Sequence, residues 1–468
     1  MTTLAVRDYD RAHGLEGPIL VVRGAGDAAY RELAEVIAPD GSIRLGQVLE
    51  TADQRTVIQL FTDSHGLNPS ELRVRMRARP LLTPVAREML GRVFDGLGRP
   101  IDGLPAPIPE DRVDVNGAAL NPTARSYPQS HIETGISAID GMNTLVRGQK
   151  LPIFSGNGMP HNDIAAQVAM QARVPQEQEA SFAILFAAMG ASHHEAERFR
   201  SALEESGAIE QSALFLNLAD DPAVERLITP RIALSLAEFL AFQHDMHILV
   251  ILTDMTHYGE ALREVSNRRG EVPTRKGYPG YLYSDLARIY ERCGRVRDCR
   301  GSITVMPVLT MPNDDITHPI PDMTGYITEG QIVLSREMNR KGIYPPVDIL
   351  PSLSRLMKDG IGADETRGDH QNLSNQLYSA YSQVQDARNL AQIIGEADLP
   401  AREKHFLKFG TAFEERFLAQ GRHEAREMTE TLDLGWETLN ALPREELTRV
   451  SREEIENHHR NNPEDPKR

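Results

Sequence analysis

The chain has 468 residues, of which 40% are hydrophobic and 25% charged, a composition typical of a globular protein of about three domains. Acidic residues outnumber basic ones by 67 to 51, and the formal net charge of −16 argues against binding to nucleic acid or anionic lipid. We expect no signal peptide, because the N-terminus lacks an apolar core, and no membrane span, because no apolar run approaches about 18 residues. The prediction is a cytoplasmic chain that reaches a membrane only through partners.

Residues 1–79 contain short runs with the pattern of β-strands. Ile19–Val22, Ile43–Leu49 and Thr56–Phe61 are apolar or alternating and are separated by turn residues. Leu72–Arg77 alternates strictly, with Leu, Val and Met on one face and three arginines on the other. Short strands with frequent turns predict a small β-barrel. The arginine face fits a solvated strand better than a nucleic-acid stripe, because no aromatic residues alternate with the arginines.

Residues 80–350 alternate between strand and helix patterns. Helical windows such as Asp163–Ala172 and His194–Glu205 follow candidate strands. The candidate strands are continuously apolar, as buried parallel strands are, and comprise Leu151–Phe154, Phe182–Met189, Ala213–Asn217, Ile248–Leu252 and Ile303–Val308. This alternation predicts an α/β domain whose sheet is connected by right-handed crossovers.

Residues 351–468 have the pattern of a helical domain. Apolar side chains recur at spacings of three and four, which makes one apolar stripe per helix, in Phe406, Phe409, Phe413 and Phe417 and again in Leu432, Trp436 and Leu439. The last residues, Asn461–Arg468, are polar and contain two prolines. We therefore expect a C-terminal α-helical bundle with a disordered tail.

No metal site is predicted. Cys293 and Cys299 are the only cysteines, too few for a four-ligand zinc site, and we expect free thiols. His193-His194-Glu195 lacks the second histidine of an H-E-x-x-H motif, which favours a solvated helix start. His458-His459 lies beside the polar tail and is expected to have no chemical role.

Residues 151–167 contain a strand, a glycine-containing loop and a helix start, the layout of a phosphate-binding loop. A working loop has the spacing G-x-x-x-x-G-K-[ST], in which lysine meets the phosphates and the hydroxyl residue binds magnesium. Counting from Phe154 puts Pro160 at the last glycine, His161 at the lysine and Asn162 at the hydroxyl residue. Shifting by one residue puts Asp163 at the last of these positions. Neither register supplies a lysine.

The missing lysine predicts weak or vestigial nucleotide binding at Ser155, Gly156, Gly158, His161 and Asn162. Proline deletes one backbone N–H from the phosphate cradle, and histidine, with a reference pKa of about 6.5, is a poor permanent cation. Taken alone, two glycines fit an ordinary strand-to-helix turn without phosphate-loop ancestry better, and it is the surrounding sequence that favours a phosphate loop.

Several longer motifs resemble the alpha/beta chains of the rotary ATPase family. They are Leu90–Gly103, Thr134–Asp140 with Arg147–Lys150, Tyr278–Ala287 and Pro345–Arg355. Together with Ser155–Asn162, they resemble the B subunits of the vacuolar/archaeal type. The resemblance covers nearly the whole chain and implies a RecA-like α/β nucleotide domain between an N-terminal barrel and a C-terminal helical bundle.

The resemblance also implies a non-catalytic subunit. Catalytic members carry Gly-Glu-Arg after the strand that follows the loop helix, whereas this chain has Gly190-Ala191-Ser192. Glu195 and Glu197 lie close by and are expected as exposed helical residues. Asp254 ends an apolar strand as a Walker B aspartate does, where it would hold magnesium through water or, as we favour without the lysine, cap or brace a loop.

Arg355, in Pro351-Ser352-Leu353-Ser354-Arg355, resembles the arginine finger that reaches a neighbour's γ-phosphate. From the residues alone, an ordinary salt-bridge arginine fits better, and only the resemblance favours the finger. The resemblance implies an alternating A3B3 ring with a catalytic A subunit, a central stalk and a peripheral stalk, coupled to proton or sodium transport. ATP or ADP with magnesium would then lie at the A–B interface, with no cofactor bound tightly by this chain.

Two other classes of function are weighed against this one. An autonomous P-loop-type NTPase, including a helicase, needs the missing lysine, and a helicase also needs a basic groove. A nucleotide-sensing scaffold outside any motor would lack an A-type partner. Asn313–Asp315 and Tyr326 are loop or interface candidates without an assigned role.

Overall fold

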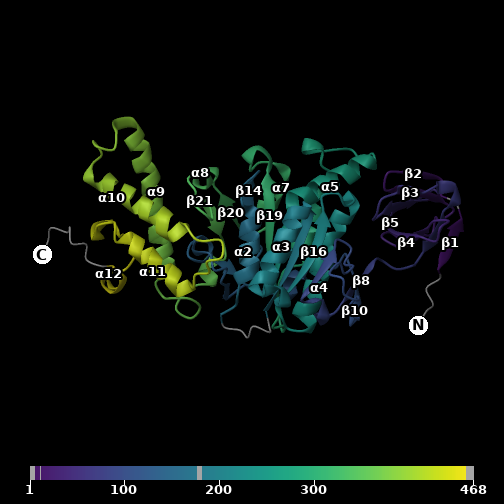
Figure 1. Cartoon of the computed structure of the whole chain (residues 1–468), viewed down its shortest axis with the longest axis horizontal. Coiled ribbons are helices and arrows are strands. Elements are labelled where there is room, and N and C mark those ends of the chain that lie inside the picture. The colour runs from purple at the N-terminus through teal and green to yellow at the C-terminus, as the bar shows by residue number, and fades with distance from the viewer. Residues whose placement is uncertain (1–5, 11, 176–181, 460–468) are drawn as a thin grey trace.

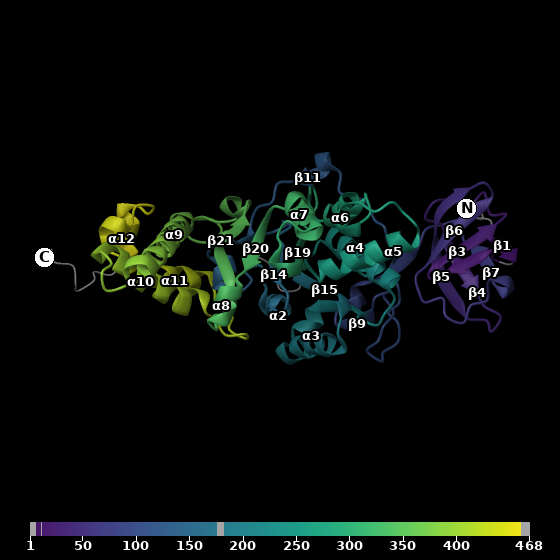
Figure 2. The same cartoon turned by 90° about the horizontal axis from the view of Figure 1, so that it is seen from above.

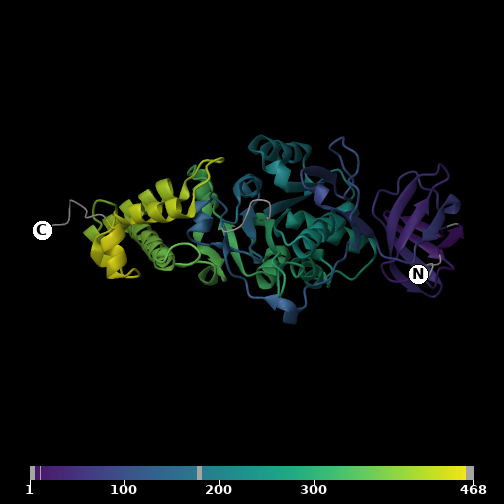
Figure 3. The ribbon, with the colours of Figure 1, turned by 90° about the horizontal axis from the view of Figure 1, so that it is seen from below.

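The computed structural model describes residues 6–10, 12–175 and 182–459. It is an elongated molecule of three parts, with a small β domain at one end, an α/β domain in the middle and helices at the other end (Figure 1). Figure 3 shows the same three parts following one another along the long axis. The tail expected at Asn461–Arg468 lies outside the described residues.

The N-terminal part is a seven-stranded antiparallel sheet with its own core. Its strands, in the order β1-β7-β4-β5-β6-β3-β2, are β1 (Arg7–Asp10), β7 (Arg73–Met76), β4 (Leu33–Ile37), β5 (Ile43–Ala52), β6 (Arg55–Leu60), β3 (Ile19–Arg23) and β2 (Gly14–Glu16). Val74 and Met76 are buried, as the alternation predicts. The three arginines that alternate with them form ion pairs with carboxylates on β1 and β4, namely Asp10, Asp8 and Glu35. The arginine face is therefore neutralised within the domain.

The middle part is built on a largely parallel sheet. The order is β21-β20-β14-β19-β17-β15-β16-β9, from strands β21 (Val347–Ser354), β20 (Gly330–Leu334), β14 (Ile153–Gly156), β19 (Ser302–Met311), β17 (His247–Thr253), β15 (Phe182–Ala191), β16 (Ser212–Leu218) and β9 (Arg92–Asp95). Short additional pairs are β8 (Leu82–Val85) with β10 (Asp111–Asp114), β12 (His131–Ile132) with β13 (Leu145–Val146), and β11 (Arg125–Ser126) with β18 (Gly294–Val296). The five strands predicted here from apolar runs are all present.

Helices cover both faces of this sheet. On β15, Ile184 and Phe186 belong to the core shared with α2 (His161–Gln171) and α3 (His193–Ser206), whereas Leu185 belongs to the opposite core. The opposite face carries α4 (Ala223–Gln243), α5 (Met255–Arg268), α6 (Leu282–Tyr290) and α7 (Pro319–Ile327). Figure 2 shows the two sets of helices on either side of the strands. Burial on both faces explains why β15 is apolar throughout.

The direction of β21 decides which residues share an edge of the sheet. β14, β19, β17 and β20 run parallel, so the loops after them meet at one edge. β21 runs antiparallel to β20, with Val347 opposite Leu334 and Ser354 opposite Gly330. The end of β21 therefore lies at the other edge. The domain boundary expected at residue 350 falls within this strand.

The C-terminal part is helical and shares a core with the middle part. Its helices are α9 (His370–Ile394), α10 (Ala401–Ala412), a π-helical turn at Phe413–Leu418, α11 (Met428–Leu439) and α12 (Arg452–His458). The four phenylalanines of the predicted stripe are all buried, and Phe409, Phe413 and Phe417 stack in sequence. The sequence pattern assigns no role to His458, but its ring stacks on Trp436 with ring centroids 5.2 Å apart.

Two further sequence predictions can be compared with the described residues. Within them, no helix is long and apolar enough to cross a membrane. Cys293 is buried and Cys299 is partly exposed, and both are free thiols.

Candidate functional site

The loop that lacks its lysine joins β14 to α2. β14 ends at Gly156, Gly158 takes a φ of +74°, and α2 begins at His161 directly after Pro160. The Oγ of Ser155 lies 3.2 Å from Nδ1 of His161. The structure thus brings together the loop residues that the sequence singled out, with an imidazole in the first turn of the helix.

An ion pair from the same edge of the sheet packs on this loop. Arg336, at the start of α8 (Arg336–Arg340), binds Asp314 at 2.8 Å and donates to the carbonyl of Asn157 at 3.0 Å. A Cβ at Gly156 would overlap the Asp314 carboxylate, so glycine lets the ion pair lie directly against the loop. Arg336 holds the pKa of Asp314 below its usual range, which keeps a negative charge against the loop.

Sequence reasoning missed the role of Arg336. A signal was present, because β20 is a short apolar strand parallel to β14 and Arg336 follows it. Residues after parallel strands gather at the carboxyl edge of a sheet. In the acidic loop Asn313–Asp315, the structure assigns Asp314 to the contact with the degenerate loop and Asp315 to an ion pair with Lys276.

Asn162 links the loop helix to two neighbouring elements. Its amide nitrogen donates to Glu195 at 2.8 Å, and its oxygen accepts from the hydroxyl of Thr253 at 2.8 Å. The expectation that Glu195 is exposed is wrong: the side chain is half-buried and closes the capping box of α3 with Ser192. Burial opposes its ionisation, but hydrogen bonds from Ser192 and Asn162 outweigh burial and hold the pKa of Glu195 low.

Asp254, at the position that resembles a Walker B aspartate, is buried, and its carboxylate accepts hydrogen bonds from Thr256 and Thr310. Its Oδ1 accepts from the backbone of Thr256 at 2.7 Å, which caps α5, and from the backbone of Thr310 at 3.2 Å. Its Oδ2 accepts from the hydroxyl of Thr310. These bonds match the capping and bracing role favoured from the sequence.

A cavity of about 280 Å³ lies beside the loop. It is lined by Asn157, Gly158, His161, Asn162, Met189, Ala191, Glu195, Phe199, Thr253, Asp254, Thr256, His257 and Thr310. Of these described residues, two bear carboxylates and none is a lysine or arginine. Ala191, at the position where catalytic members carry glutamate, lies on the wall. Phosphates are best held by fixed positive charge, which no side chain lining this cavity carries permanently.

Arg355 lies at the other edge of the sheet, directly after β21. Its side chain is exposed, and within the described residues its guanidinium forms no hydrogen bond or ion pair. Its backbone N–H donates to the carbonyl of Glu329 at 3.0 Å. Counting along the paired strands, about six residues separate it from Gly156, roughly 20 Å at about 3.3 Å per residue.

Other candidates from the sequence are separate from this loop. His193 is exposed and pairs with Asp220, as expected for a solvated helix start. Tyr326 on α7 is 75% exposed. No cluster of three or more potential metal ligands occurs among the residues that the structure describes.

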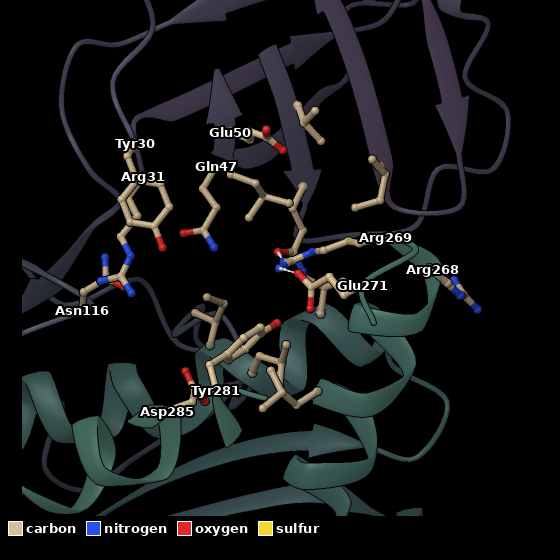
Figure 4. A pocket seen from close by; sticks show the side chains of 18 of the residues that line it. Tyr30, Arg31, Gln47, Glu50, Asn116, Arg268, Arg269, Glu271, Tyr281 and Asp285 are labelled. Atoms are coloured by element: carbon tan, nitrogen blue, oxygen red, sulfur yellow. Dashed lines mark hydrogen bonds and ion pairs between the residues drawn. The ribbon is translucent and has the colours of Figure 1, made fainter. Parts of the chain in front are cut away.

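A larger cavity, of about 910 Å³, separates the barrel from α5 and α6 (Figure 4). Tyr30, Arg31, Gln47 and Glu50 line it from the barrel side. Arg269 and Glu271 lie across from them and form an ion pair at 3.4 Å. None of residues 155–163 lines this cavity, so it is separate from the cavity beside the loop that lacks its lysine.

Comparison with known proteins covers all three parts of the chain. Residues 135–354 match the ATP synthase alpha/beta family, nucleotide-binding domain, and residues 16–76 match that family's beta-barrel domain. Residues 359–459 match the C-terminal domain of V and A type ATP synthase. The predicted fold class, with a β-barrel, an α/β nucleotide domain and a C-terminal helical domain, is confirmed.

Individual relatives are similar over nearly their whole length. The V-type ATP synthase beta chain of Halothermothrix orenii is 55% identical over 98% of both chains. The B subunit of the A-type ATP synthase of Aeropyrum pernix is 57% identical over 97% of this chain and 98% of that one. A solved structure, the ATP synthase subunit NeqB from Nanoarcheaum equitans, is 36% identical with a TM-score of 0.73 and matches 88% of this chain and all of that one. The chain therefore belongs to the ATP synthase alpha/beta family, among the V-type beta chains and A-type B subunits.

Proposed function

We propose that this chain is a non-catalytic subunit of a rotary ATP synthase and completes the ATP site of a neighbouring catalytic A subunit with Arg355. ATP or ADP with magnesium lies at that interface, and no nucleotide is bound tightly at the chain's own loop. Alternating A and B subunits form a ring around a central stalk, held by a peripheral stalk on the cytoplasmic face of a membrane. Turnover in the ring is coupled to proton or sodium transport.

One observation carries the proposal, which is the separation of Arg355 from the chain's own loop. The guanidinium is exposed and unpaired within the described residues, at the sheet edge opposite Gly156. It therefore lies too far away to serve that loop, which supports a role at a phosphate held by another subunit. A planar, permanently charged guanidinium suits the spread negative charge of a transferring phosphoryl group.

The loop itself supports the non-catalytic part of the proposal. Its cavity carries the carboxylates of Glu195 and Asp254, and Asp314 adds a third carboxylate on the outer side of the loop. Ala191 stands where a catalytic chain carries the glutamate that orients water. Without a lysine at residues 160–163 and without a glutamate at residue 191, the loop lacks the ammonium that meets a triphosphate and the group that positions its attacker.

The test is Arg355→Ala in a ring reconstituted from this chain and its A partner. We expect ATP turnover to fall about 10³-fold or more, the range measured for arginine fingers. Ring assembly, followed by size-exclusion chromatography, is expected to be unchanged because the side chain is exposed. Wild-type turnover from an assembled Arg355→Ala ring would refute the proposal.

Two further measurements separate the alternative functions. An autonomous NTPase requires substantial ATP turnover by the isolated chain, and we expect none. A scaffold outside a motor requires that no A-type subunit be recovered in equal amount when the chain is purified from its source, and we expect equal recovery.

A further inference from the structure

We infer that Gln149 is a positioning residue for Arg355: its buried side chain binds two groups that hold the backbone leading into the arginine, the carbonyl of Glu329 and the hydroxyl of Ser354. The inference rests on the proposed function of Arg355 and extends it to a residue that does not touch nucleotide. Gln149 lies in the turn between β13 and β14 and has no exposed surface.

The first group is the carbonyl of Glu329, just before β20. This oxygen accepts the backbone N–H of Arg355 at 3.0 Å and also the side-chain Nε2 of Gln149 at 3.1 Å. The hydrogen bond that ends the β20–β21 pairing is thus shared with Gln149. The carbonyl oxygen of Glu329 therefore binds both the backbone N–H of Arg355 and the side-chain amide of Gln149.

The second group is the hydroxyl of Ser354, the residue before Arg355. It donates to the carbonyl of Thr144 at 3.0 Å and accepts from Nε2 of Gln149 at 3.0 Å, with Oε1 of Gln149 further away at 3.4 Å. Ser354 is itself buried. The end of β21 that carries the arginine is therefore bonded through Ser354 to both Gln149 and Thr144.

The amide of Gln149 is held in this orientation by its own turn. Its Oε1 accepts from the backbone of Val146 at 2.9 Å, while its backbone N–H returns to the carbonyl of Val146 at 3.0 Å. Gly148 takes a φ of +91°, which closes the turn. With the oxygen fixed, both hydrogens of the amide point at the two groups beside Arg355.

A neighbouring buried lysine, Lys150, also holds Glu329. Lys150 binds Glu329 at 2.8 Å and Glu291 at 3.2 Å. Burial lowers the pKa of Lys150, but the two carboxylates outweigh burial and raise it, so the ammonium stays charged. Glu329 is then held through its carboxylate by Lys150 and through its carbonyl by Gln149.

Loss of these hydrogen bonds should lower the catalytic rate more than it weakens substrate binding. An exposed arginine samples many rotamers, so its reach depends on where its Cα is held. Displacement by about 1 Å can cost on the order of 10²-fold in rate. Loss of Gln149 releases the Cα without removing the guanidinium.

The experiment is Gln149→Met in the reconstituted ring, with kcat and KM for Mg·ATP measured separately. Methionine keeps the length of the side chain and removes both donors. We expect kcat to fall about tenfold with KM unchanged within about twofold. The matched control is Gln376→Met, another buried glutamine, which binds Glu446 and Arg449 in the C-terminal domain. The control is expected to keep kcat.

A double-mutant cycle shows whether Gln149 acts through the arginine. Gln149→Met in an Arg355→Ala ring is expected to lower the residual kcat by less than about twofold, because no side chain is left there to position. A full tenfold loss in that background, an unchanged kcat in the single variant, or an equal loss in Gln376→Met each overturns the inference. If Gln149→Met does not assemble, Ser354→Ala, which removes one of the two bonds, replaces it under the same criteria.

Failure of the inference and failure of the proposed function are distinguishable. If Arg355→Ala leaves turnover intact, the proposed function falls and this inference falls with it. If Arg355→Ala abolishes turnover and Gln149→Met leaves kcat unchanged, only the inference falls.

Discussion

Asp254 occupies a position at which related catalytic chains would place a magnesium ligand. In this chain its two oxygens accept hydrogen bonds from Thr256 and Thr310, so the carboxylate joins the start of α5 to the end of β19. The side chain is 6% exposed. Its contacts are therefore those of a helix cap inside the domain.

This arrangement predicts the effect of Asp254→Ala on the isolated chain. The loss of an N-cap and of a buried acceptor should lower the free energy of unfolding by about 2 kcal/mol. Asp254→Asn, which keeps one oxygen for the cap, should lose less. Urea unfolding followed by far-UV circular dichroism measures both. If Asp254 is a structural cap, the difference in the free energy of unfolding between wild type and Asp254→Ala is the same with and without magnesium. A difference that appears only with magnesium would contradict this role.

The start of α9 ties the helical domain to the nucleotide domain through His370. Its Nε2 lies 3.2 Å from the carbonyl of Gly141, which can only accept, so Nε2 donates there. In the neutral ring, Nδ1 then accepts from the hydroxyl of Thr366 at 3.0 Å. Burial lowers the pKa of His370 to about 4, against an ordinary value of 6.5. The fold therefore requires the uncharged ring.

A pH dependence follows from this helix start. Between pH 6.5 and pH 4 the unfolded chain binds a proton at His370 that the folded chain does not, so stability falls as the pH is lowered. Between pH 7 and pH 5 the loss should be about 2 kcal/mol. His370→Gln should remove this part of the acid sensitivity, whereas exposed His423→Gln should keep it. Urea midpoints followed by the fluorescence of Trp436, the single tryptophan, measure the difference. Equal slopes in the wild type and His370→Gln would count against it.

At the scale of the whole molecule, the buried residues form cores that do not coincide with the three parts. One core runs from the nucleotide domain into the helical domain and contains both Phe186 and Trp436. The barrel core includes Val22, Ile58 and Val74 and has no member beyond Met76. The helical domain thus shares a core with its neighbour, whereas the barrel keeps a core of its own and adds Leu33 and Phe61 to the second core of the middle part.

This division predicts two unfolding transitions for the isolated chain. The barrel should unfold separately because most of its buried apolar residues belong to its own core, while the other two parts unfold together because they share one. Ile58→Ala should destabilise the barrel transition by about 2–5 kcal/mol and leave the Trp436 midpoint unchanged. Differential scanning calorimetry with parallel fluorescence tests this. A parallel shift of both transitions would mean that the barrel unfolds with the rest.

The pattern of the sequence by itself determined the order of the three parts, the buried strands and the phenylalanine stripe. These features depend on periodicity, which is local: alternation buries Val74 and Met76, and a spacing of three and four buries Phe409 and Phe413. The absence of a lysine at residues 160–163 is likewise visible without a structure.

Only the tertiary structure decided what surrounds the two candidate sites. Asp314 and Arg336 reach the degenerate loop because β19 and β20 end at the same edge as β14. Glu195 is held by Asn162, a contact that depends on how α2 packs against α3. Arg355 lies far from its own loop because β21 runs antiparallel. Strand order and direction are set by long-range packing, which local periodicity does not encode, so these contacts could not be derived from the sequence pattern alone.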